Sequence, residues 1–580
     1  MEIAEELAQK FRNAAVIAAC EQCGCCSSAC PLTGKNDFNI RRIIRHVQLD
    51  FVNEMADSPL PWFCTTCGRC EEACPNSVDI LAGIRVLRQL SPPERVPDWP
   101  PCTLACPAGV DVPGYLRLIA QEKVDDAYAL ILEKVPFPGV LGRVCTHPCE
   151  DACRREAVNM PIAICALKRY VADNASGSWR ERLRVKDDTG HKIAIIGAGP
   201  TGLTAAFYLR IKGHQVTIFE SRSEPGGMMR FGIPAHRLPQ AILEKEINQI
   251  LELGIELKTG QKLGKDFDLN QLKSQGYEAV FLALGAQLSR KIELEGADLE
   301  GVLWGLDFLS GVREGKEVSL KDKVLVVGGG NVAIDVALTD LRFGAKEVTL
   351  ACLETREEMP ANRWEVEQAI NEGVKLMPSW GPSRILGIDG KASGIELVRC
   401  TSVFDAEGNF SPTFDNNTKA KVRVEQVILA IGQTIDLSFV DPEGLLKLER
   451  GLIVVQDTQE TGMPGVFAGG DVAKLPGTVI EATAAGRRAA SSIDRFLGGD
   501  GNIEETLWQR PAPEPYTGKR DKGFAGQGRV EMPKAPVSER HPSFAEVELG
   551  LDAEQATREA KRCLQCDLEL IIGRESSPGD

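Results

Sequence analysis

The cysteines near the N-terminus follow a spacing that few folds can accommodate, and the spacing occurs twice. The first run, CEQCGCCSSACP, spans 20–31, and the second, CTTCGRCEEACP, spans 64–75. Without Cys25, both read Cys-x2-Cys-x2-Cys-x3-Cys-Pro. Three thiolates on such a loop can bind three irons of a cubane cluster, while its fourth corner points away from the loop. The proline fixes its own φ and turns the chain away.

Two such runs in one domain predict two 4Fe–4S clusters that exchange their fourth ligand, because the cysteine before the proline ligates the other cluster in two-cluster ferredoxins. One predicted set is Cys20, Cys23, Cys26 and Cys74, and the other is Cys64, Cys67, Cys70 and Cys30. Zinc is the alternative, since it also favours paired Cys-x2-Cys, but it needs only four ligands and no Cys-Pro. Cys25 is surplus and receives no role.

Length and composition indicate a large chain of several domains. Its 580 residues allow three or four domains, at roughly 150 residues each. No run approaches the roughly 18 apolar residues of a membrane helix, so no membrane insertion is expected. The opening MEIAEELAQK is acidic and amphipathic, unlike a signal peptide. We therefore expect a cytoplasmic protein whose nineteen cysteines serve metal. A net charge of −15 argues against nucleic-acid binding.

The sequence around the doubled run carries a resemblance to a known subunit. Helical residues separate the two runs, and SVDILAGIRVLRQL follows the second. Residues 1–90 resemble the C subunit of heterodisulfide reductase, most specifically through WFCTTCGRCEEACPNSVDI. The proline-rich SPPERVPDWPP then marks a domain boundary.

From about residue 100 the chain resembles the small subunit of NADPH-dependent glutamate synthase. The resemblance begins with PCTLACPAGVDVPGYL and GRVCTHPCEDACRREAVNMPIAICALKRYVAD and runs to the C-terminus. Dihydropyrimidine dehydrogenase and the electron-bifurcating ferredoxin:NADP transhydrogenase share this module. Family members usually carry a Cys-x2-Cys ahead of the first Cys-x3-Cys-Pro, but here only Cys102 and Cys106 are present.

The C-terminal EAKRCLQCDLEL offers the missing pair. Our hypothesis is that this tail folds back, so that one cluster uses Cys102, Cys153, Cys563 and Cys566. The resemblance implies a second cluster on Cys106, Cys145, Cys149 and a ligand from the helix carrying ICALKR, where Cys165 is the only thiol. The alternative is that the tail pair binds zinc or nothing.

KIAIIGAGPTGLTAAFYLRIKGHQVTIFE, residues 192–220, predicts a strand, a glycine turn, a helix and a second strand ending in an acid. Such a unit places a pyrophosphate on the helix N-terminus and ribose hydroxyls at the acid. The resemblance assigns this fold to FAD and adds the loop EPGGMMRFGIPAHRLP and the later GVFAGGDVAKLPGTVIEATAAGRRAA. The residues expected at FAD are Gly197, Gly199, Gly202, Glu220, Gly227, Arg230, Gly470 and Asp471.

A second fingerprint, KVLVVGGGNVAIDVA at 323–337, lies inside the first fold. The order resembles two-dinucleotide-binding flavoproteins, with LALGA and LAIGQ as crossover strands. Relatives that use NADPH commonly carry two arginines at 353 and 354, where this chain has leucine and glutamate. A carboxylate there accepts from a 2′-hydroxyl and repels a phosphate, so NADH is predicted over NADPH, with Arg356 as the reservation. The expected nicotinamide site comprises Gly328, Gly330, Asn331, Ala333 and Glu354.

These patterns predict an α/β fold with two nested Rossmann-like domains for FAD and NAD(P), preceded by all-α 4Fe–4S domains. We expect a heterodisulfide reductase C-like domain at 1–90 and a helical cluster domain at 91–188. The FAD domain is expected in two parts, 189–315 and 434–500, around the NAD(P) domain at 316–433. A loosely structured C-terminal arm is expected at 501–580. Between 190 and 500 only Cys352 and Cys400 are thiols, so no redox-active pair is expected beside the flavin.

The predicted function is electron transfer. NADH delivers a hydride to FAD, and single electrons pass through four clusters to a partner, or in reverse. Expected partners are a heterodisulfide reductase B-like subunit, a ferredoxin-linked oxidoreductase or ferredoxin, and a bifurcating role stays open. The alternatives are the small subunit of glutamate synthase and a cluster-bearing adaptor whose nucleotide folds are structural.

Overall fold

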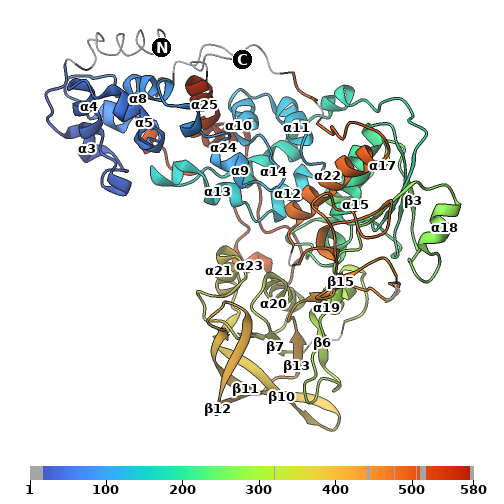
Figure 1. Ribbon diagram of the computed structural model, residues 1–580. Coiled ribbons are helices and arrows are strands. Elements are labelled where there is room, and N and C mark those ends of the chain that lie inside the picture. Colours follow the sequence, from blue (N-terminus) through green and yellow to red (C-terminus); the bar gives the residue numbers. More distant parts are fainter. Residues whose placement is uncertain are drawn as a thin grey trace.

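The computed structural model describes residue 17 and residues 19–318, 321–440, 444–475, 477–504, 506–509 and 518–574. The opening MEIAEELAQK lies outside the described residues. Figure 1 shows the helical N-terminal regions, blue to cyan, extending sideways from the two sheet-containing domains. In the described part of the chain, no helix is long and apolar enough to cross a membrane.

The first helical region is built around the two cysteine runs. Gly24 and Gly68 have φ of 90° and 86° and begin short helices after the second cysteine of each run, so the doubled spacing gives the same turn twice. Asn39 accepts from the backbone of Arg42 and caps a helix whose apolar residues recur on one buried face. The helices are α3 (Cys25–Ala29), α4 (Ile40–Gln48), α5 (Val52–Asp57), α6 (Leu60–Phe63), α7 (Arg69–Glu72) and α8 (Ile80–Gln89).

The second helical region follows the proline-rich linker. Asp111 accepts from the backbone of Gly114 and caps its first long helix. A Cβ added at Gly142 would lie 2.6 Å from the Cα of Arg169, so this glycine allows two helices to pack closely. The helices are α9 (Pro101–Ala105), α10 (Val112–Ala120), α11 (Val124–Leu132), α12 (Pro138–Val144), α13 (Pro148–Asp151) and α14 (Ile164–Asn174).

The first nucleotide domain has a five-stranded parallel sheet in the order β17-β4-β1-β2-β3. The apolar residues of four of these strands, all but β3, are buried on both faces of the sheet, as is typical of parallel sheets. The strands are β1 (Lys192–Ile196), β2 (Gln215–Phe219), β3 (Glu256–Lys258), β4 (Ala279–Leu282) and β17 (Val466–Ala468). The main helices are α15 (Pro200–Ile211), α17 (Gln240–Leu251) and α22 (Val479–Phe496).

The second nucleotide domain repeats this architecture inside the first. Its parallel sheet has the order β6-β13-β7-β8-β9 and therefore begins before the expected boundary at 316. The two crossover segments, which follow LAL (282–284) and LAI (429–431), pair with each other. They form an antiparallel ribbon of β5 (Leu288–Ser289) and β14 (Gln433–Thr434). The strands are β6 (Val302–Trp304), β7 (Lys323–Val327), β8 (Glu347–Cys352), β9 (Lys375–Pro378) and β13 (Gln426–Leu429), with helices α19 (Gly305–Arg313), α20 (Asn331–Phe343) and α21 (Arg363–Asn371). An antiparallel sheet of β10 (Trp380–Ile388), β11 (Lys391–Phe404) and β12 (Phe410–Val422) completes this domain.

The C-terminal segment packs along the helical regions, so the expectation of a loosely structured arm is wrong for its described part. Leu551, Ala556 and Ala560 are buried in the main core, and α24 (Ala553–Lys561) packs on α10. The last described helix, α25 (Cys566–Arg574), packs on α8, and α23 (Val537–Arg540) lies beside the second nucleotide domain (Figure 1). The predicted fold class, two Rossmann-like domains preceded by helical regions, is confirmed.

Candidate functional site

A cavity of about 280 Å³ opens at the carboxyl ends of the first parallel sheet. Ligands of open α/β folds bind at this edge of the sheet. The cavity also reaches the second nucleotide domain and the loop around Cys145, where Val144 and Thr146 line it. Further lining residues are Gly197, Gly199, Thr201, Glu220, Arg222, Gly227, Arg237, Asn331, Asp335 and Asp471.

The first glycine turn has the close approaches that a dinucleotide fold needs. Gly197 has φ 109°, and a Cβ there would lie 2.4 Å from the Ala283 carbonyl oxygen. A Cβ at Gly202 would lie 2.0 Å from the Gly197 carbonyl oxygen, so helix α15 packs tightly on the turn. The Glu220 carboxylate accepts from the Ala198 N–H at 2.8 Å and lines the cavity. The turn and its acid therefore face one binding space.

The loop after β2 only partly follows the expectation. Gly227, with φ 52°, lines the cavity and approaches Gly199. Arg230 is not among the lining residues, because its guanidinium donates to the Pro225 carbonyl and pairs with Glu224 and Glu244. Arg230 therefore does not line this cavity, and its place at the flavin stays a prediction.

Arg237, from the same loop, lines the cavity instead and reaches the second nucleotide domain. It pairs with Asp335 at 2.7 Å and with Glu365. Both carboxylates are nearly buried, so this arginine connects α20 and α21 to the first domain. Nothing in the sequence distinguished Arg237 from Arg230, because both lie in the loop EPGGMMRFGIPAHRLP.

The loop after β17 contributes Asp471 to the cavity. Burial, and secondarily the charge of Glu481, raises the pKa of Asp471 to about 6. Its neighbour Gly470 has φ 75°, and a Cβ there would lie 2.4 Å from the Thr201 hydroxyl oxygen. Gly470 therefore allows the loop to approach the first glycine turn and to present Asp471 to the cavity.

The second glycine turn repeats the geometry of the first. Gly328 has φ 144°, and a Cβ there would lie 2.2 Å from the Ala430 carbonyl oxygen. Ala333 is fully buried below the turn, while a Cβ at Gly330 would meet open space. The Asn331 side chain accepts from the Asn362 N–H at 2.8 Å. The Glu354 carboxylate stands against the turn, since its Oε2 would lie 2.5 Å from a Cβ on Gly329.

The cysteines of the first helical region gather in two places. Cys20, Cys23, Cys26 and Cys74 together line one small cavity. Burial raises the pKa of the Cys70 thiol, and the nearby thiols of Cys64, Cys67 and Cys30 raise it further. The structure thus brings each proline-preceding cysteine to the other run. Cys25 is exposed and does not line the cavity.

The cysteines of the second region also gather in two places. Cys102, Cys153, Cys563 and Cys566 line one cavity, to which the C-terminal tail contributes the last two. The second group surrounds the buried ammonium of Lys168. Burial lowers the pKa of Lys168, but four neighbouring thiols outweigh burial and raise it: Cys145, Cys165, Cys149 and Cys106.

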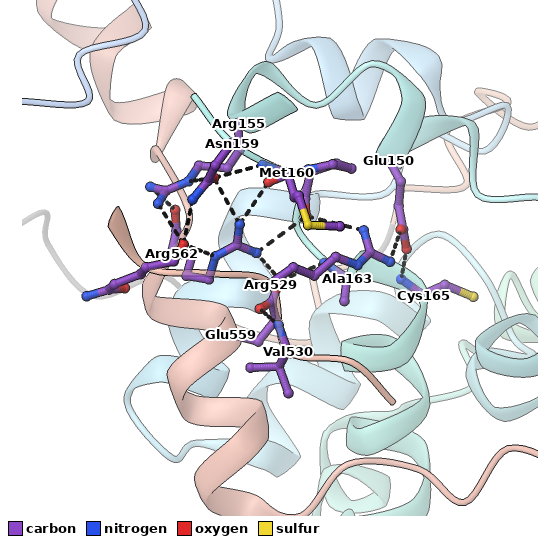
Figure 2. Close-up of polar contacts among 12 residues, drawn as sticks. Glu150, Arg155, Asn159, Met160, Ala163, Cys165, Arg529, Val530, Glu559 and Arg562 are labelled. Carbon is purple, nitrogen blue, oxygen red and sulfur yellow. Dashed lines mark hydrogen bonds and ion pairs between the residues drawn. The ribbon is translucent and has the colours of Figure 1, made fainter. Parts of the chain in front are cut away.

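The tail is held at this place by buried polar contacts (Figure 2). Arg562 pairs with Glu559 and donates to the Met160 carbonyl at 2.8 Å, and both side chains are fully buried. Glu559 accepts from the Ala163 and Val530 N–H groups at 2.9 and 2.8 Å. These contacts place the Cys563-x2-Cys566 pair beside the second helical region.

The same segment also positions a cysteine of the second group (Figure 2). Glu150 accepts from the Cys165 N–H at 2.8 Å and pairs with Arg529 at 2.7 Å. Because Glu150 is buried, the arginine from the C-terminal segment compensates its charge. These contacts fix the start of helix α14, where the Cys165 thiol has Cys145 and Cys149 as electrostatic neighbours.

The donor sets suit cubane clusters. Burial raises the pKa of Cys563 to about 12, and metal binding would require this thiol to lose its proton. Among the described residues, no group of three or more potential ligands closes around a single metal ion. Cubane thiolates bind four separate irons and therefore stand further apart than the ligands of one ion. The remaining thiols, Cys352 and Cys400, are buried in the second nucleotide domain.

Comparison with known families agrees with this division of the chain. Residues 191–486 match the pyridine nucleotide-disulphide oxidoreductase family. Residues 98–179 match the 4Fe–4S cluster domain II of dihydropyrimidine dehydrogenase, and residues 16–78 match the 4Fe–4S dicluster domain. The expected cofactor types, FAD and 4Fe–4S clusters, are supported by these matches.

Three curated relatives are similar over most of the chain. The NADP(+)-dependent formate dehydrogenase subunit beta of Moorella thermoacetica is 39% identical over 83% of this chain and 72% of its own. The NADPH-Fe(3+) oxidoreductase subunit beta of Geobacter sulfurreducens is 34% identical over 89% and 84%. The glutamate synthase [NADPH] small chain of Escherichia coli is 33% identical over 69% and 89%. This chain belongs to the pyridine nucleotide-disulphide oxidoreductase family, as an NAD(P)H-dependent flavin and iron–sulfur oxidoreductase of the glutamate synthase small-chain type with N-terminal 4Fe–4S domains.

Proposed function

We propose that this chain is the subunit of a larger oxidoreductase that exchanges a hydride with NADH and single electrons with a partner protein. FAD, when bound, accepts a hydride and releases electrons one at a time to 4Fe–4S clusters. The proposal is supported by the residues that line the cavity. They come from the first glycine turn, from Asn331 of the second nucleotide domain, and from either side of Cys145.

Within that cavity, residues of this chain would bind the two nucleotides and orient them. Glu220 would accept hydrogen bonds from ribose hydroxyls, and Asp471 from a hydroxyl nearer the flavin. Arg237 holds α20 through Asp335, which keeps Asn331 at the cavity wall. The second glycine turn leaves open space at Gly330 for a pyrophosphate.

The four cysteine groups follow one another away from the cavity. The group of Cys145 is the one beside it, and Cys149 of that group is an electrostatic neighbour of Cys102 in the tail-completed group. The groups of the first helical region lie beyond. We infer that each group binds one cluster, four in all, and that the outermost exchanges electrons with the partner.

The partner is proposed to be another redox subunit, either heterodisulfide reductase B-like or a ferredoxin-linked oxidoreductase, with ferredoxin as a further acceptor. The two relatives that match 83% and 89% of this chain are both named as beta subunits of other oxidoreductases. The glutamate synthase small chain matches only 69% of this chain, so we favour a role with the first two.

The proposal is tested by anaerobic purification with metal, sulfide and flavin analysis, followed by NADH oxidation with a one-electron dye. We expect one FAD, about sixteen irons for four clusters, and rapid dye reduction. A flavin-replete preparation that does not reduce the dye would instead favour an adaptor subunit.

Replacement of Asp471 by alanine is expected to weaken FAD binding. Loss of a hydrogen bond to a charged group costs about 1.5–3 kcal/mol, which corresponds to a roughly 10- to 150-fold larger dissociation constant for FAD. The measurement is fluorescence titration of the flavin-depleted protein with FAD. The exposed Asp500, replaced in the same way, serves as the control and should leave affinity unchanged. Unchanged affinity for Asp471→Ala would remove this residue from the FAD site.

NADH is the proposed nucleotide because Glu354 stands against the second glycine turn. Its carboxylate would repel a 2′-phosphate by about 1–4 kcal/mol at 4 Å, depending on the effective dielectric constant. The names of two relatives specify NADP(+) and NADPH, so both nucleotides must be compared.

We expect the wild type to show the higher kcat/KM with NADH, and Glu354→Arg to raise the NADPH-to-NADH ratio at least tenfold. Glu357→Arg, an exposed neighbour in the same segment, is the matched control and should change the ratio little. A wild-type preference for NADPH that Glu354→Arg does not alter would contradict the assignment.

A further inference from the structure

One arginine connects two of the four cysteine groups. Arg154 follows Cys153 and lines the cavity of the tail-completed group, together with Cys102, Cys563 and Cys566. Its Nη2 donates to the Cys64 carbonyl at 2.8 Å, and Cys64 belongs to the next group, in the first helical region. A single side chain therefore touches both groups and crosses the boundary between the two helical regions.

The same guanidinium also fixes the approach of the two regions. Besides Cys64, Nη2 donates to the carbonyls of Trp62 and Phe63 at 2.7 and 2.9 Å. Three successive carbonyls at the start of the second cysteine run therefore point at one cation. The segment leading into Cys64 is held against the chain that carries Cys153.

Arg154 differs from a neighbouring arginine in the partners of its charged group. Its neighbour Arg88 also donates to the Cys64 carbonyl, at 2.6 Å, but Arg88 forms a buried ion pair with Glu569 at 2.8 Å. Among the described residues, no carboxylate lies within ion-pair distance of Arg154, whose charged hydrogen bonds go to carbonyl oxygens. Thiolate-ligated clusters carry net negative charge, so a cluster in either neighbouring group would interact favourably with this cation.

We propose that Arg154 is a positioning residue that raises the reduction potential of two neighbouring clusters at once, and thereby sets the junction at which electrons cross between the helical regions. The inference rests on the proposed function, because it requires a cluster in each group. When a cluster takes up one electron, its net charge becomes more negative by one. A nearby fixed cation stabilises that reduced state relative to the oxidised one.

The test is a potentiometric titration of Arg154→Gln, Arg154→Lys and wild type, followed by electron paramagnetic resonance, with iron and sulfide counted in each sample. In Arg154→Gln, the midpoint reduction potentials of two of the four clusters should fall by about 59 mV, which is about a tenfold change in the equilibrium of a one-electron reduction. The other two should stay in place, and Arg154→Lys should return the shifted pair toward wild type. Lys123→Gln, which removes an exposed cation from the same region, should shift none.

Each alternative result is decisive. If no titration moves, or if Arg154→Lys shifts the clusters as far as Arg154→Gln does, the charge of Arg154 does not set the potentials and the proposal is overturned. Loss of iron from Arg154→Gln with retention in Arg154→Lys would support a requirement for the charge. Loss from both variants would assign Arg154 to packing alone and overturn the proposal. Wild-type protein without iron would instead reject the proposed function.

Discussion

The double variant Cys563→Ser/Cys566→Ser is expected to lose about four of its iron atoms, one cluster, and to keep its FAD. The two cysteines line one cavity with Cys102 and Cys153, and no other cysteine lines it. Hydroxyl groups are poor ligands for soft iron–sulfur centres, so the cluster should not assemble. Iron, sulfide and flavin analysis of anaerobically purified protein provides the measurement.

Cys25→Ser is the matched control for this variant. Cys25 is exposed and lies outside the cavity of the other N-terminal thiols, so its replacement should leave the iron content at the wild-type value. An unchanged iron content in the double variant would show that the tail pair ligates no cluster. Equal losses in the control and the double variant would also contradict the assignment.

The second large effect is expected from Arg562→Ala. Arg562 and Glu559 form a fully buried pair, and removal of one partner of such a pair costs about 3–5 kcal/mol because the other charge stays buried and unpaired. Glu559 also accepts from Ala163 and Val530, so the segment between 524 and 566 should open from the second helical region. We expect faster hydrogen exchange confined to this segment and partial loss of iron.

Arg558→Ala on the same helix is the control, because Arg558 is exposed. Hydrogen exchange by mass spectrometry resolves the segment, whereas a single unfolding free energy is not defined for a multidomain protein with cofactors. Exchange in Arg562→Ala that matches wild type would mean that the buried pair does not hold the tail. Equal acceleration in Arg558→Ala would attribute the effect to the helix as a whole.

The sequence predicted those features that follow from local spacing. The two cysteine runs predicted which thiols meet, because the Cys-Pro geometry sends the fourth cysteine to the other run. The glycine turns predicted the nested nucleotide domains, because only glycine fits where Gly197 and Gly328 approach a carbonyl oxygen within 2.4 and 2.2 Å of a would-be Cβ.

The return of the tail cysteines to Cys102 and Cys153 was also predicted, but other contacts between distant segments were not. The proline- and charge-rich composition of the C-terminal segment suggested a loose arm, yet Arg562 forms a fully buried pair with Glu559, and Arg529 pairs with the buried Glu150. Likewise, Arg237 rather than Arg230 lines the cavity, because its partners Asp335 and Glu365 come from the other nucleotide domain. Arg154 acquires its role only when Cys64 docks beside it.

We expect reducing equivalents from the nicotinamide nucleotide to reach the cysteine-bound clusters through the flavin cavity. This route is tested by an electron paramagnetic resonance spectrum of the anaerobic protein after addition of NADH alone, with a dithionite-reduced sample for comparison. We predict that NADH produces signals of reduced 4Fe–4S clusters and that flavin depletion abolishes them. Signals that appear with dithionite but never with NADH or NADPH in flavin-replete protein would contradict this route.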